Sequence, residues 1–198
     1  TPDQLLALGI LGEVAAVPVL LAHLSLEELA PAAALGLNVI TGAELYEKAF
    51  IPEVMDEDEL FEDEKEQVKK GQPVLRPDGK PYGENVVRLS QKTEDWQQWW
   101  NVNKQRFKAS LRYRSGVPFS PGSLVENMAF EKTPRKIRQL AYEELVIRYG
   151  ADIPFETDMP VKQQQAAIAK WKGWVTANEG RFKAGEWYLG GQLIGKSG

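Results

Sequence analysis

Residues 7–42 read ALGILGEVAAVPVLLAHLSLEELAPAAALGLNVITG, and this stretch predicts three short helices. Apolar residues recur in it at helical spacing, and Gly12 stands where the first helix is expected to end. Pro18 falls in the first turn of the second helix, a position that tolerates proline. Ser25 is the candidate N-cap of the third. Short helices with small residues at their contacts indicate stacking of the α-solenoid type.

The composition excludes several classes of protein. The 198 residues include no Cys and a single His, His23, so disulfide scaffolds, Cys-ligated metals and thiol chemistry are excluded. A lone histidine also argues against His-rich metal sites and His-centred triads. No apolar run reaches the roughly 18 residues that span a bilayer, and no basic and apolar leader opens the chain. We therefore expect a cytoplasmic protein without a cofactor or a metal.

Charge is concentrated in one segment. Between Glu53 and Glu66, nine of fourteen residues are acidic. Such a run predicts either a solvated loop or helix face, or an electrostatic surface for a basic partner. A calcium loop is excluded, because Leu60 and Phe61 stand where an EF-hand needs a ligand and a glycine. The candidate partner-binding residues are Asp56, Glu57, Asp58, Glu59, Glu62, Asp63 and Glu64.

The segment after the acidic run is rich in Pro and Gly. We expect a short helix over residues 43–54 and then, from residue 71 to residue 83, no continuous helix. Asp78-Gly79 suits a hairpin turn that would pair Val74-Leu75 with Asn85–Leu89, although an irregular loop fits equally well. This stretch is the candidate linker between two helical parts.

Helix signals return after residue 92. Thr93 is a candidate cap for a helix that places its aromatic residues on one face, and we expect that face to be buried. Ser120-Pro121 and Thr133-Pro134 are further candidate starts, and Gly150 is a candidate end. A last long helix is expected from Val161 to about Asn178. The alternative is a nucleic-acid surface that combines the aromatic face with Lys104, Arg106, Lys108, Arg112 and Arg114.

The C-terminal residues 190–197 match the P-loop pattern Gly-x4-Gly-Lys-Ser. That motif needs a strand before it and a helix after it, whose N-terminus faces the phosphates. At most three strand residues precede it, Trp187-Tyr188-Leu189, and one residue follows it. We therefore expect a flexible tail and no nucleotide site.

Two stretches are similar to known proteins. Residues 7–13 and 16–21 resemble the Ala-Leu-Gly-x-Leu-Gly and Val-Pro-x-Leu pattern of HEAT repeats. Further motifs resemble an uncharacterised bacterial HEAT-repeat family that is found in type VI secretion gene neighbourhoods. They are Ile40-Thr41-Gly42, Trp99-Trp100, Arg106-Phe107, Arg112-Tyr113, Gly116-x-Pro118 and Arg135…Arg138…Ala141…Glu144-Leu145. The chain departs from that family at Ser110 and Thr133, where glycines are expected. The family implies no enzymatic activity and no catalytic residue.

Together these features predict an all-α fold, in which a HEAT-like α-solenoid segment precedes a bundle-like C-terminal part and an irregular loop or small hairpin lies between them. The expected domains are HEAT-like repeats (1–55), an acidic segment with its linker (56–92), a helical part (93–180) and a tail (181–198). Because the first residue is not Met and lies in an expected helix, we expect a piece of a longer protein.

The predicted function is protein binding without catalysis. The first hypothesis is a type VI secretion immunity protein that binds and neutralises a cognate toxin, with the acidic run against a basic surface of that toxin. The second is an adaptor or chaperone that loads a type VI effector, and the third is a nucleic-acid-binding helical-repeat protein. No membrane partner is expected.

Overall fold

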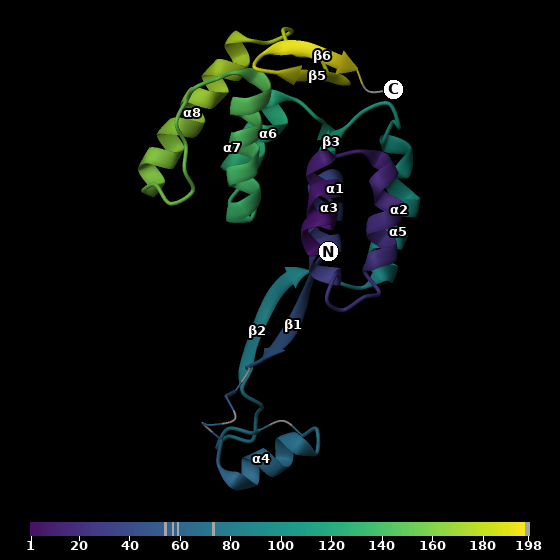
Figure 1. Cartoon of the computed structure of the whole chain (residues 1–198), viewed down its shortest axis with the longest axis vertical. Coiled ribbons are helices and arrows are strands. Elements are labelled where there is room, and N and C mark those ends of the chain that lie inside the picture. Colours follow the sequence, from purple (N-terminus) through teal and green to yellow (C-terminus); the bar gives the residue numbers. More distant parts are fainter. Residues whose placement is uncertain (54, 57, 59, 73, 197–198) are drawn as a thin grey trace. The chain divides into compact units, whose positions relative to one another are not determined.

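The computed structural model (Figure 1) describes residues 1–53, 55, 56, 58, 60–72 and 74–196. The chain divides into two compact units, a main unit (Thr1–Leu45 with Gln91–Gly198) and a hairpin unit (Tyr46–Ser90). Within the described part of the chain, no helix is long and apolar enough to cross a membrane.

Helices dominate the main unit. They are α1 (Pro2–Leu11), α2 (Val17–His23), α3 (Ala30–Thr41), α5 (Thr93–Asn103), α6 (Pro121–Ala129), α7 (Arg135–Tyr149) and α8 (Val161–Ala177), with 3-10 turns at Val14–Ala16 and Lys104–Arg106. Its antiparallel strand pairs are β3 (Tyr113–Arg114) with β4 (Val117–Pro118) and β5 (Glu186–Leu189) with β6 (Gln192–Lys196). The hairpin unit contains β1 (Tyr46–Pro52), α4 (Glu62–Lys69) and β2 (Gly83–Leu89).

The predicted all-α fold is wrong. Of the residues that the structure describes, 50% are helical and 16% are in strands, and these strands form three small antiparallel sheets. The helix expected over residues 43–54 is replaced by β1, whose Tyr, Phe and Ile side chains favour a strand. β1 pairs with β2 from Tyr46↔Leu89 to Pro52↔Gly83. The hairpin predicted from Val74-Leu75 is therefore wrong in its pairing, and Leu75 makes only a bridge to Pro81.

The flexible tail expected at the C-terminus is also corrected, because β5 and β6 form a hairpin there (Figure 1). Gly190 and Gly191 close it with φ angles of 56° and 79°, which a type I′ turn requires and glycine adopts without strain. The amides of these glycines donate to the carbonyls of Ile147 and Arg148 at 2.8 and 2.9 Å. The turn is therefore fixed to the last part of α7. Residues 190–196 of the P-loop pattern are divided between this turn and β6, and Ser197 lies outside the described residues.

The N-terminal helices pack closely because two glycines meet. A Cβ atom on Gly9 of α1 would lie 2.5 Å from the Cα atom of Gly36 on α3. α1 ends at Gly12 in the left-handed conformation, as predicted. The predicted cap at Ser25 is wrong, since α3 begins at Ala30 and the Ser25 hydroxyl donates to the carbonyl of Ala22.

Among the described residues, buried side chains of the main unit include two clusters that meet at α7. The larger lies among α6, α7 and α8, and Trp171 and Met128 are fully buried in it. The smaller joins Leu6 of α1 and Val39 of α3 to Ile137 of α7. α7 therefore belongs to both clusters and connects the N-terminal helices to the C-terminal ones.

Candidate functional site

An apolar groove opens on the surface of the hairpin unit. Its volume is about 670 Å³, within the range of pockets that hold ligands. The residues that line this groove are Phe50, Pro52, Glu53, Met55, Leu60, Val68, Gly71, Gln72, Val74, Pro81 and Tyr82.

Four segments of the unit build the groove. β1 contributes Phe50 and Pro52, α4 contributes Val68, and the loops on either side of α4 contribute most of the rest. Leu60 and Val74 are buried and form the small core of the unit, whereas Phe50 and Val68 remain 41% and 45% exposed. Apolar side chains therefore remain in contact with water along the groove.

The loop between α4 and β2 is held by an arginine. The Arg76 guanidinium donates to the carbonyl of Gly83 at 2.8 Å and lies 5.6 Å from the centre of the Tyr82 ring. These contacts fix Tyr82, which lines the groove. The Pro- and Gly-rich segment, predicted to be a linker, is thus one wall of the groove.

Several acidic residues lie close in sequence to the residues that line the groove. Glu53 lines the groove itself, and Asp56 and Asp58 are exposed in the segment between Met55 and Leu60. The hairpin unit has twelve acidic and seven basic residues, a formal charge of −5, although the whole chain has only −4. The negative charge of the chain is therefore concentrated in the unit that carries the groove.

The seven predicted partner-binding residues have different environments. The Glu62 carboxylate is 93% exposed and pairs with Lys65 at 3.1 Å. Glu64 instead stabilises α4 locally, because its carboxylate accepts from the amide of Phe61 at 2.8 Å. Together with Asp56 and Asp58, Glu62 is available to a partner. Glu57 and Glu59 lie outside the described residues, as does the side chain of Asp63.

A second concentration of charge lies inside the main unit, where three arginines surround one glutamate. Arg114 is fully buried and Arg112 is 3% exposed. The Glu144 carboxylate accepts from an Nη2 donor of Arg114 and from Nε of Arg148 at 3.1 Å, and it lies 3.9 Å from Nη2 of Arg112. We call these four residues the arginine cluster.

Aromatic rings and backbone carbonyls complete the arginine cluster. The Arg112 guanidinium lies between Phe119 and Trp187, 4.1 and 4.2 Å from the ring centres. Arg112 also donates to the carbonyl of Leu11, and Arg114 donates to that of Ile10 at 3.0 Å. These carbonyls belong to the negative end of α1, which cations stabilise.

Burial of the arginine cluster has an energetic cost. Burial, and then the neighbouring Arg148, lower the pKa of Arg112 to about 10, so that it stays charged at neutral pH. Burial also lowers the pKa of Arg114, while Glu144 raises it. One carboxylate and the end of a helix dipole thus offset three buried or partly buried positive charges.

This environment weakens the alternative of a nucleic-acid surface on the basic residues after the aromatic helix. Arg112 and Arg114, two of the five basic residues in the alternative nucleic-acid surface, are inside the fold. The expected burial of the aromatic face is seen most clearly at Trp96, which is 1% exposed, and at Phe107, which is 8% exposed.

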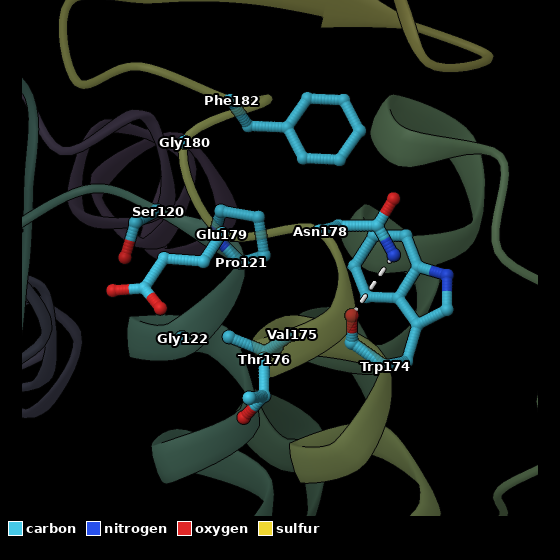
Figure 2. Close-up of a pocket in the computed structure, with 10 residues that line it drawn as sticks. All are labelled: Ser120, Pro121, Gly122, Trp174, Val175, Thr176, Asn178, Glu179, Gly180 and Phe182. Carbon is cyan, nitrogen blue, oxygen red and sulfur yellow. Dashed lines mark hydrogen bonds between the residues drawn. The ribbon is translucent and has the colours of Figure 1, made fainter.

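Figure 2 shows a second pocket, of about 300 Å³, between the start of α6 and the end of α8. Ser120 and Gly122 lie on the left of the view, and Trp174 and the Phe182 ring lie on the right. The polar groups here cap helices: the amide of Ser123 donates to Ser120 Oγ at 3.2 Å, and the Asn178 side chain donates to the carbonyl of Trp174 at 2.9 Å. We assign no ligand to this pocket.

Comparisons with known proteins were made for the whole chain. No family model, curated protein or solved structure matches it. Within the residues that the structure describes, no three His, Asp or Glu side chains are placed to hold a metal ion. Function must therefore be inferred from the two charged features and the groove.

Sequence reasoning found the acidic segment but missed the groove and the arginine cluster. The groove draws residues from positions 50 to 82, so its formation depends on the pairing of β1 with β2. Arg112 and Arg114 are two apart along the chain, a spacing that places side chains on one face of a strand. This spacing could have indicated that the two arginines lie together. No pattern in the sequence indicated that Glu144 is their partner.

Proposed function

We propose that the chain is a non-enzymatic protein-binding module whose docking surface is the hairpin unit. The observation that carries the proposal is an apolar groove on a small unit of charge −5. Interfaces of this kind combine an apolar centre with a charged rim. Exposed carboxylates such as Asp56, Asp58 and Glu62 favour a partner with a basic surface and speed its association.

We propose further that this partner is a toxin and that the chain is its cytoplasmic immunity protein in a type VI secretion system. The support for this finer statement is the resemblance of residues 5–150 to a family found in such gene neighbourhoods. A negatively charged docking surface suits the basic surface that a nuclease toxin presents to nucleic acid. The arginine cluster supports the main unit and takes no part in docking.

The experiment expresses the product of the neighbouring open reading frame in cells that contain or lack this protein. We expect the product to kill cells and the protein to restore growth. The triple variant D56K/D58K/E62K should lose this protection, whereas E27K/E28K/E143K, which reverses three exposed acids of the main unit, should retain it. Loss of secretion without any effect on growth would replace the immunity proposal by the adaptor.

The same variants predict the kinetics of binding. The acidic triple variant should reduce the association rate at low salt about tenfold or more, with a smaller effect on dissociation. Surface plasmon resonance at two salt concentrations measures this. An association rate equal to that of the E27K/E28K/E143K control would remove the acidic residues from the interface.

A further inference from the structure

Some of the apolar side chains that line the groove remain in contact with water and are not buried by the hairpin unit. Phe50 and Val68 line it while remaining nearly half exposed. Only Leu60 and Val74 of its lining are buried by the unit itself. Apolar surface arranged around a concavity is typical of sites where a partner inserts a side chain.

We infer that this groove binds one face of a basic amphipathic helix supplied by the partner. This inference rests on the proposed function, and it adds the chemistry of the docked segment. The groove is large enough for more than one apolar side chain, which suits residues that recur on one face of a helix. Glu53 lines the groove, and the exposed Asp56 directly follows the lining residue Met55 in sequence, so carboxylates accompany the apolar lining.

Charge decides between the candidate occupants. An acidic or neutral helix gains nothing from a unit of charge −5, and an anionic membrane is repelled by it. Lys or Arg on the polar face of the helix would pair with exposed carboxylates, among which that of Glu62 is 93% exposed. Apolar contacts in the groove then slow dissociation of the segment, and the opposite charges speed its association.

The test uses the full chain and three labelled 14-residue peptides. The first has Leu on one helical face and Lys on the other, the second has Ser in place of Leu, and the third has Glu in place of Lys. We expect the Leu/Lys peptide to bind, the Ser/Lys peptide to bind at least about tenfold more weakly, and the Leu/Glu peptide not to bind. Fluorescence anisotropy at two salt concentrations measures the affinities.

Two exposed valines of the hairpin unit provide matched variants. Val68 lines the groove and Val87 on β2 does not, and each is exposed, at 45% and 68%. V68K should weaken binding of the Leu/Lys peptide about tenfold, while V87K, with the same change of charge, should alter it less than twofold. Circular dichroism of both variants checks that the unit remains folded.

The outcomes separate the inference from the proposed function. If the Leu/Lys and Ser/Lys peptides bind equally, or if V68K and V87K have equal effects, the groove is not the docking site, although basic partners still bind. If neither basic peptide binds at low salt, the docking surface proposed for the hairpin unit is lost as well. Self-association of the chain that V68K abolishes would make a second copy the occupant and overturn the inference.

Discussion

Two features of the main unit depend on single residues. Glu144 lies within 4 Å of Arg112, Arg114 and Arg148, so that one carboxylate is shared by three guanidinium groups. Gly9 and Gly36 allow α1 and α3 to approach until their backbones are in contact. Removal of the charge of Glu144, or addition of a side chain at Gly9, is therefore expected to destabilise the main unit.

The first prediction concerns Glu144. E144Q removes the negative charge and leaves three neighbouring positive charges without their shared counterion, so we expect a loss of about 3–5 kcal/mol in the free energy of unfolding. Urea denaturation followed by circular dichroism measures this. E143Q, at the next residue and exposed, should change the free energy of unfolding by less than about 0.5 kcal/mol. Equal stabilities of the two variants would contradict the assigned role of Glu144.

The second prediction compares two helical glycines. G9A places a Cβ atom 2.5 Å from the Cα atom of Gly36, and we expect it to destabilise the fold by about 1–3 kcal/mol. G173A meets nothing within 4 Å on α8, and alanine there should stabilise the fold by up to about 1 kcal/mol. Thermal unfolding should shift in opposite directions. A G9A variant that unfolds at the temperature of the unchanged protein, or above it, would contradict the contact between α1 and α3 at Gly9.

At the scale of elements, helices were easier to predict than strands. α6 begins at Pro121 after the cap at Ser120, and α7 ends at Gly150, both as predicted, because caps are local signals. β1 was predicted to be helical although its Tyr, Phe and Ile side chains favour a strand, because the pairing that fixes the strand joins Tyr46 to the distant Leu89. The groove depends on that pairing. The sequence therefore predicted the acidic segment but not the groove itself.

The C-terminal hairpin shows how a motif can mislead. The pattern Gly190 to Ser197 satisfies a phosphate-binding expression, yet its first two glycines form the turn between β5 and β6. Gly-Gly between two apolar segments is itself a hairpin signal. Read in this way, residues 186–196 could have been predicted to be a hairpin.

The third prediction tests this hairpin by hydrogen exchange. The amides of Gly190 and Gly191 donate to carbonyls of α7, so we expect both to exchange at least about 100-fold more slowly than in an unstructured peptide. Nuclear magnetic resonance measures the two rates individually. Exchange at the rate of a free peptide would restore the flexible tail that the sequence suggested.

The whole molecule consists of a main unit interrupted by the hairpin unit. The chain enters and leaves the hairpin unit through strands paired with each other, and Glu47 lies opposite Arg88. These two side chains also form an ion pair at 3.1 Å. The proposed docking surface is therefore inserted between two strands that pair with each other.

The fourth prediction follows from this insertion. Replacing residues 48–87 by Asn-Gly joins Glu47 to Arg88 through a two-residue turn, which suits a paired position. We expect the shortened chain to keep its cooperative unfolding and its helical circular dichroism. It should bind the Leu/Lys peptide at least about tenfold more weakly than the full chain. Retained peptide binding would place the docking surface on the main unit.

The arginine contacts to α1 also bear on the order in which the chain folds. Arg112 and Arg114 reach the carbonyls of Leu11 and Ile10 across 101 and 104 positions of sequence. A ribosome that has made only the first forty residues has not yet produced the groups that secure the end of α1. We therefore expect the end of α1 to be secured only after residue 114 has been made, and shorter nascent chains to remain more sensitive to proteases.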